Sequence, residues 1–374
     1  MIRLLVNVCR ILLGLTLTLS GLAKAIDPRG TQYKIEDYLG AIGLSAIVKD
    51  WQALTLSVTL STVEFLLGIL LLFAIRRRLV SMATLLLMTV MTAISIWIVI
   101  ANPVSDCGCF GDAIHLTNGQ TLLKNIVLLG CAIMVAWKSE LMPALLPKSI
   151  QWIVPNGALL SCLAISAWGL YYLPLIDFRP YHIGADIREG MTIPKGEKGP
   201  TLLTTFIMEK DGERKEFTLE NYPDSTWTFI DSKTVEIEKG YEPPIHDFSI
   251  VDNESGEDIT KQVVNDKGYT FLLISPYLEQ ADSRYFGEID AIYEYAKEHR
   301  YAFYCLTSSN DKAIADWKDL TGAEYPFCMT DATTLKTIIR SNPGLVLIRN
   351  GKVMGKWSHH NLPKTNSLDK QKTM

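Results

Sequence analysis

The sequence has little cysteine, little net charge and, in its first half, little charge of any kind. Seven cysteines in 374 residues are too few and too scattered for a secreted domain that disulfides hold together. A net charge of −4, spread along the chain, excludes the strongly basic surface that binds nucleic acid. Acidic residues are scarce before residue 175, whereas residues 176–374 have the mixed charge of an ordinary soluble sequence.

Long apolar runs take the place of charge in the first half. Five of them approach or exceed the ~20 residues that a helix needs to cross a bilayer, and they cover residues 2–22, 54–75, 79–101, 121–137 and 152–174. The first run has no A-x-A cleavage site, so we interpret it as a retained span and not as a signal peptide. The sequence therefore predicts an α-helical bundle in a lipid bilayer, followed by a soluble half.

Basic residues predict how the bundle is oriented. The triplet "RRR" at 76–78 separates the second and third spans, Lys138 and Lys148 separate the fourth and fifth, and Arg3 is at the amino terminus. Because cytoplasmic loops carry the excess of Lys and Arg, we expect a cytoplasmic amino terminus. Five crossings then place the soluble half, and the loop after the third span, on the periplasmic side of a bacterial inner membrane.

Two ionisable residues fall deep within the predicted spans. At ~1.5 Å per residue, Arg10 lies roughly 12 Å above the inner boundary and Glu64 roughly 15 Å below the outer boundary of a ~30 Å core. These depths nearly coincide, which predicts an Arg10–Glu64 pair. The pair is either functional, as intramembrane charges often are, or a structural clamp between two helices. Lys24 and Lys124 lie near the outer boundary, where long basic side chains extend to the interface.

The predicted outer loop carries two thiols, Cys107 and Cys109, with one glycine between them. Glycine permits the tight bend that a disulfide between such neighbours needs, and strain in the small ring makes the bond easy to reduce. This is the behaviour of an exchanging disulfide. Asp106 and Asp112 flank the pair, and their charge alone would raise the thiol pKa values, so a helix dipole or Lys124 would have to compensate.

The runs "SGLAKAIDPRG", "VEFLLGILLL" and "DCGCFGD" resemble the DoxX/MauE group of redox-associated membrane proteins. The resemblance covers residues 1–140 and implies a four-helix membrane domain. MauE proteins act in methylamine utilisation, where they help a disulfide-rich partner to mature. The fifth span, within residues 141–176, and the soluble half depart from that pattern.

The soluble half begins with a predicted β-rich module near the membrane, residues 177–244, with a hairpin turn at Asp211-Gly212. From residue 245 the pattern changes to strand, helix, strand, helix and a final hairpin that turns on Asn350-Gly351. This order of elements predicts an α/β sandwich with a central sheet. We expect residues 363–374 to form a disordered tail.

Residues 245–362 resemble the thioredoxin fold in its TlpA-like form, and Pro343 occupies the place of that fold's cis-proline. The resemblance implies a Cys-x-x-Cys after the first core strand, at the start of a helix. The sequence there reads "ISPYLEQADSR" and has no cysteine. We therefore interpret the domain as a degenerate thioredoxin fold that cannot exchange dithiols at this position.

The remaining candidates have simpler interpretations. Cys305 and Cys328 fall on strands expected to be neighbours, where the two thiols either meet or are buried and inert, as unpaired cysteines often are. His359 and His360 look like a metal pair, but adjacent strand residues point to opposite faces, so we predict no metal site there.

Three hypotheses for the function remain open. In the first, Cys107 and Cys109 exchange with a thiol or disulfide of a periplasmic protein. Electrons then pass to a membrane partner or a quinone, and Arg10 and Glu64 assist proton movement. In the second, Cys107 and Cys109, together with His115 or Asp112, bind a soft metal. In the third, the protein is a non-catalytic envelope scaffold whose short disulfide shapes the loop.

Overall fold

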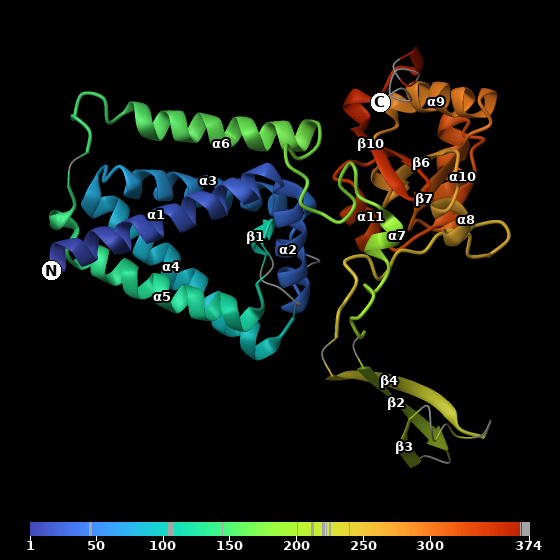
Figure 1. Ribbon diagram of the computed structural model, residues 1–374, viewed down its shortest axis with the longest axis horizontal. Helices are drawn as coiled ribbons and strands as arrows, with labels where there is room; N and C mark the ends of the chain where they lie inside the picture. The colour runs from blue at the N-terminus through green and yellow to red at the C-terminus, as the bar shows by residue number, and fades with distance from the viewer. Residues whose placement is uncertain are drawn as a thin grey trace.

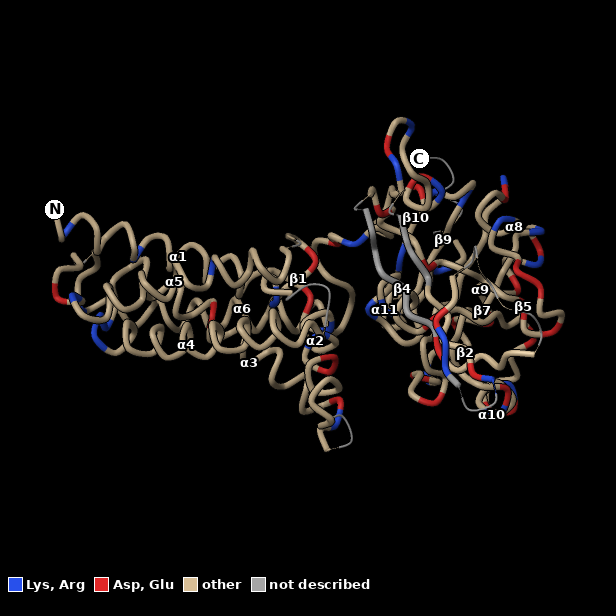
Figure 2. Tube along the Cα trace, turned by 90° about the horizontal axis from the view of Figure 1, so that it is seen from below, with Lys and Arg blue, Asp and Glu red and all other residues tan. Residues whose placement is uncertain are grey.

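The computed structural model describes residues 1–374 except 45–46, 104–107, 115, 144, 200, 211–212, 219–220, 222, 224–225, 239, 367 and 369–374. A long helical bundle forms one half of the molecule and an α/β domain the other, with a small separate sheet beside the second (Figure 1). Most Lys, Arg, Asp and Glu residues lie on the α/β half and at the ends of the bundle (Figure 2).

Five helices are long and apolar enough to cross a membrane, and they confirm the five predicted spans. Their bounds are Ile2–Ile26 (α1), Asp50–Leu72 (α3), Arg77–Ala101 (α4), Asn118–Trp137 (α5) and Ile153–Tyr171 (α6). A helix that was not predicted, α2 (Pro28–Ala41), follows α1 directly. It begins there because the Asp27 carboxylate accepts a hydrogen bond from the Gly30 N–H and proline occupies the first helical position.

Helices α1 and α3 cross with their backbones almost in contact. A Cβ atom added to Gly21 would lie 2.4 Å from the backbone nitrogen of Phe65, and one added to Gly68 would lie 2.5 Å from that of Thr18. Only glycine fits at such an approach, which is the usual way that membrane helices pack closely. The short distance between the two helices lets polar side chains of one reach the other.

The α/β half is built on one mixed sheet of strand order β10-β9-β6-β7-β8-β5. Strands β6 (Tyr269–Ser275), β7 (Ala302–Thr307) and β8 (Phe327–Met329) run parallel. Strand β9 (Gly344–Arg349) pairs antiparallel with β6 and β10 (Lys352–Ser358), and β5 (Val251–Asp252) is the far edge. Helices cover the sheet: α8 (Thr260–Val264), α9 (Phe286–Glu298), α10 (Asp311–Thr321) and α11 (Ala332–Ile338).

This architecture confirms the predicted fold class, a membrane helix bundle followed by a thioredoxin-like α/β sandwich. Each face of the sheet has its own apolar core. The turn between β9 and β10 lies at Asn350 and Gly351, both with positive φ, as the Asn-Gly dipeptide predicted. The Asn342–Pro343 peptide bond, which precedes β9, is cis.

A second, three-stranded antiparallel sheet lies apart from both halves (Figure 1). It comprises β2 (Thr201–Lys210), β3 (Glu213–Thr218) and β4 (Thr228–Glu238). Lys210 pairs with Glu213, so β2 and β3 form the expected hairpin, although its turn residues lie outside the described residues. The segment before this sheet, with α7 (Ile187–Gly190), packs Tyr181 and Ile187 into the α/β core.

The carboxy-terminal tail differs from the expectation of disorder at one residue. The Leu368 side chain is 2% exposed and packs into the core on the α9 side of the sheet. Its apolar surface therefore fixes the chain beyond residue 363 at this point.

We predict that Gly68→Ala destabilises the bundle by about 1–3 kcal/mol, because the new methyl group overlaps the α1 backbone and forces the helices apart. Gly130→Ala in α5 is the matched control, since a Cβ there meets nothing within 4 Å. Thermal unfolding of both variants in one detergent checks this. Equal melting temperatures for the two would contradict it.

Candidate functional site

A buried charged cluster lies where α1 and α3 meet β1 (Cys109–Asp112). The Lys24 ammonium donates to Glu64 Oε2, to Ser20 Oγ and to the carbonyl of Cys109, each at 2.7 Å. Ser20 Oγ also lies 2.7 Å from both Glu64 Oε2 and the Cys109 carbonyl. The side chains of Lys24 and Glu64 are 6% and 4% exposed, so all three ammonium donors are used without water.

The predicted Arg10–Glu64 pair is therefore wrong, and so is the expectation that Lys24 extends to the interface. Glu64 pairs with Lys24, whereas Arg10 donates to the carbonyl of Leu72, the last residue of α3. The depth estimate failed because the first turns of α3 extend past the end of α1. Ser57 already lies level with Pro28 and donates to its carbonyl, which places Glu64 near the carboxy-terminal end of α1.

Arg10 lies away from the Lys24–Glu64 cluster, at the carboxy-terminal end of α3. A helix leaves its last carbonyls without partners, and its carboxy-terminal end carries partial negative charge. The Arg10 guanidinium, 5% exposed, meets this end of α3 through Leu72. Arg10 thus stabilises the carboxy-terminal end of α3, apart from the cluster around Glu64.

Strand β1 carries Cys109, half-buried, beside the carboxy-terminal end of α1. Gly108 and Gly111 both have positive φ, 59° and 56°, which favours glycine at each place. A Cβ on Gly108 would lie 3.1 Å from Cγ of Lys34, whose side chain passes over this glycine from α2. Cys107, the other predicted redox residue, and His115, a candidate metal ligand, lie outside the described residues.

Arg340, in the turn after α11, joins the α/β half to this loop. Its guanidinium forms ion pairs with Asp112 of β1 at 3.0 Å and with Asp27, between α1 and α2, at 2.9 Å. The side chain is 6% exposed and lies over the Tyr33 ring of α2. Burial disfavours the charged form of Asp27, but Arg340, Arg179 and the Gly30 N–H outweigh it and hold the pKa of Asp27 below its ordinary value. The Asp27 carboxylate therefore stays ionised, and paired with Arg340, at pH values at which an ordinary aspartate is already protonated.

The linker after α6 adds a second group of charges. Asp177 pairs with Arg179 at 2.7 Å and with Lys356 of β10 at 2.6 Å, and Arg179 donates to the carbonyl of Thr337. Burial, and after it the nearby charge of Arg179, lower the pKa of Lys356 to about 7. Arg179 also donates to Asp177, so Asp177 keeps a guanidinium partner when Lys356 loses its proton.

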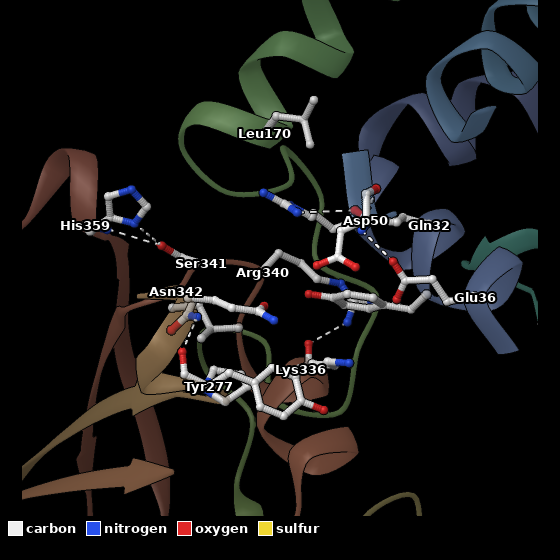
Figure 3. A pocket seen from close by; sticks show the side chains of 15 residues that line it. Gln32, Glu36, Asp50, Leu170, Tyr277, Lys336, Arg340, Ser341, Asn342 and His359 are labelled. Atoms are coloured by element: carbon white, nitrogen blue, oxygen red, sulfur yellow. Dashed lines mark hydrogen bonds between the residues drawn. The ribbon is translucent and has the colours of Figure 1, made fainter. Parts of the chain in front are cut away.

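A polar cleft of about 410 Å³ lies between the two halves (Figure 3). Residues of α2 and α3 form one wall, and the segments after β6 and before β9 form the other; they include Arg29, Gln32, Tyr33, Glu36, Asp50, Tyr277, Lys336, Asn342 and His359. Asn342 donates to the carbonyl of Tyr277 and accepts from Ser275, which ties the two segments together. The wall after β6 is the sequence "SPYLEQ", where the thioredoxin resemblance places cysteines, and none of the described residues that line the cleft is a cysteine.

The two histidines lie beside this cleft in a geometry that differs from the expectation. They belong to a short 3-10 helix, His359–Asn361, and not to a strand, so their rings are 4.0 Å apart and not on opposite faces. His359 Nδ1 lies 2.8 Å from Ser341 Oγ, and His360 Nδ1 lies 2.9 Å from the Tyr285 hydroxyl. His360 also stacks on Tyr171 at the end of α6, which makes it part of the contact between the halves.

Cys305 and Cys328 lie on neighbouring strands but face opposite sides of the sheet. Cys305 is aligned with Phe327 and Cys328 with Leu306, and each thiol is buried in a different core. Both are free. Burial raises the pKa of Cys305 far above its ordinary value, and burial and Asp252 raise that of Cys328 to about 12. Neither thiol is suited to exchange chemistry.

Comparison with known proteins covers the halves separately. The family of methylamine utilisation protein MauE matches residues 2–138, and a domain family of unknown function matches residues 203–239. No curated protein matches the chain. One similar solved structure is the "Solution structure of a putative protein disulfide isomerase from Bacteroides thetaiotaomicron". It is 18% identical with a TM-score of 0.28, and the match covers 34% of this chain and 84% of that chain.

We predict a strong energetic coupling between Lys24 and Glu64 and none between Arg10 and Glu64. Lys24→Met or Glu64→Gln alone leaves a buried charge without its partner, and each lowers the free energy of unfolding by about 3–5 kcal/mol. The double variant costs clearly less than the sum. Arg10→Gln combined with Glu64→Gln is the control cycle and should be additive. A cycle with the opposite result, measured by unfolding in detergent, would restore the Arg10–Glu64 pair.

We also predict that Cys305 and Cys328 stay unmodified by maleimide in the folded protein from pH 7 to 9, because both thiols are buried and protonated. Mass spectrometry before and after denaturation measures this. Rapid labelling of either thiol in the native protein would show that the sheet opens and that these cysteines can take part in exchange.

Proposed function

We propose that this is an integral membrane thiol–disulfide redox protein that exchanges through Cys107 and Cys109 with a protein thiol or disulfide on the outer side of the membrane. In one direction, a thiolate of the partner attacks the Cys107–Cys109 disulfide and forms a mixed disulfide. The partner's second thiol displaces it, so the partner gains a disulfide and the pair becomes a dithiol. Two electrons and two protons then leave the pair for a membrane quinone or a membrane redox protein.

The observation that carries this proposal is that buried side chains of the bundle bind the backbone carbonyl of Cys109. Buried charges in a membrane are costly, and a lysine whose three donors all have partners is well compensated. Lys24 uses one of those donors, with Ser20 beside it, on the carbonyl of Cys109. A buried ion pair of the bundle thus fixes the main chain of a cysteine in a polar loop, which favours a defined task for that cysteine.

The charges around β1 support the same chemistry. Lys34 passes over Gly108, the Lys124 ammonium lies 4.7 Å from the centre of the Phe110 ring, and Arg340 offsets the charge of Asp112. Positive charge near a cysteine favours the thiolate, which is the attacking species. The flanking carboxylate that counted against a reactive thiol in the sequence is therefore compensated at Asp112.

The α/β domain contributes recognition in this proposal. Its segment after β6 has no cysteine, yet the cleft between the two halves lies at that place, and Arg340, which pairs with Asp112, is one of the residues that line the cleft. We propose that the membrane loop carries the exchangeable sulfur pair and that the domain holds the partner. In the proposed orientation the amino terminus is cytoplasmic, and both the loop and the domain lie in the periplasm of a bacterial inner membrane.

A scaffold without catalytic activity is the second candidate. The contact between the halves combines ion pairs, the Tyr171–His360 stack and a hydrogen bond from Ser358 to the carbonyl of Tyr171. Such an interface also suits a protein that only positions its partners. In that case the short disulfide would shape the loop and would never open.

We predict that the Cys107–Cys109 pair cycles in living cells. Acid quenching and alkylation of intact cells should show both dithiol and disulfide forms, and quinone depletion should increase the dithiol fraction. Cys107→Ser or Cys109→Ser should each trap a mixed disulfide with the partner. The Cys305→Ala/Cys328→Ala variant is the control and should cycle like the native protein.

Two other results would point elsewhere. A pair that stays oxidised, whatever the quinone supply, supports the scaffold. Metal that purifies with the native protein and is lost from both serine variants supports the soft-metal site.

A further inference from the structure

Arg340 is a buried charge that touches three separate parts of the chain. It comes from the turn after α11, and its guanidinium pairs with Asp27 at the end of α1 and with Asp112 of β1. It also lies over Tyr33 of α2 and donates to the carbonyl of Lys336. The α/β domain therefore docks on the bundle through the same side chain that neutralises the strand carrying Cys109.

Docking and the charge at β1 are consequently two parts of one equilibrium. When the domain is docked, Asp112 has a guanidinium partner three residues from Cys109. When the domain leaves, Asp112 loses that partner, because Arg340 moves with the domain. Docking and the reactivity of β1 share this interaction, so each changes the free energy of the other by the same amount.

The other charges around β1 remain in place when the domain leaves. Lys24 and Glu64 pair with each other below the strand, and Lys34 of α2 and Lys124 of α5 flank it. All of these belong to the bundle. In the part of the chain that the structure describes, Arg340 is thus the charge beside β1 that depends on docking.

We propose that Arg340 is a positioning residue that couples docking of the α/β domain to the reactivity of Cys109. The docked state is the reactive one for two reasons. Cys109 remains half-exposed beside the docked domain. Arg340 also offsets the charge of Asp112, which would otherwise disfavour the thiolate of Cys109. A partner that binds the domain and alters docking therefore alters the chemistry of the loop. This regulation rests on the proposed redox function of the loop.

The test measures one thiol in the full-length protein, reconstituted in nanodiscs, with Cys107→Ser in every variant. Alkylation of Cys109 is followed by mass spectrometry as a function of pH, and docking by the distance between spin labels on α2 and α10. Arg340→Gln should increase the undocked population, slow alkylation at pH 7 about tenfold and raise the midpoint of the pH profile by about one unit. Arg340→Lys keeps the charge and should stay within about threefold of Arg340.

Two further variants separate coupling from general damage. Arg349→Gln removes an exposed arginine of the same domain and should match the parent. In an Asp112→Asn background, Arg340→Gln should change the alkylation rate less than twofold, because the charge it compensates is gone. An Arg340→Gln variant that releases the domain but keeps the parent's pH profile overturns the proposal. A full tenfold effect that persists with Asp112→Asn also overturns it.

The failure of this coupling can be told apart from the failure of the proposed function. Alkylation of a single thiol needs neither a partner nor a cycling disulfide. If the pH profile shifts as expected but the native pair never cycles in cells, the coupling stands and the redox function falls. If the pair cycles and the profile does not shift, the loop exchanges without control by the domain.

Discussion

The structure depends on the Lys24–Glu64 ion pair, which is buried inside the membrane bundle. Neither charge is tolerable alone in that environment, so each must meet the other. They meet because glycines bring the backbones of α1 and α3 almost into contact. The same ammonium then holds the carbonyl of Cys109. Helix packing in the bilayer is in this way connected directly to the polar loop outside it.

A second set of charges connects that loop to the α/β domain. Arg340 forms ion pairs with two carboxylates of the membrane half, Asp27 and Asp112. Asp177, which pairs with Arg179 and with Lys356, fixes the linker against β10. The two sets share strand β1. Lys24 binds the carbonyl of its first residue, Cys109, and Arg340 binds the carboxylate of its last, Asp112. A strand of four residues therefore receives constraints from both halves of the protein.

The sequence predicted those features that follow from local pattern. The length of the apolar runs predicted the five spans. The order of elements and the Asn350-Gly351 turn predicted the α/β sheet. Pairing across space was harder. Depth along each span predicts an Arg10–Glu64 pair, whereas Glu64 pairs with Lys24 because α3 extends past the end of α1, which no local pattern shows. Asp27 and Pro28 are a local signal that a helix begins after α1, but they do not show that α3 packs along that helix. Arg340 carried no signal, since its partners are hundreds of residues away.

The hydroxyl of Ser20 has a consequence for how the bundle communicates with the loop. It lies within hydrogen-bond distance of both Glu64 and the Cys109 carbonyl, but it has one proton to donate. Serving one acceptor means releasing the other. Any change in the negative charge of Glu64 shifts that choice, and so tightens or relaxes the main chain at Cys109. The Ser20 hydroxyl thereby links a carboxylate of the membrane helices to the main chain of Cys109.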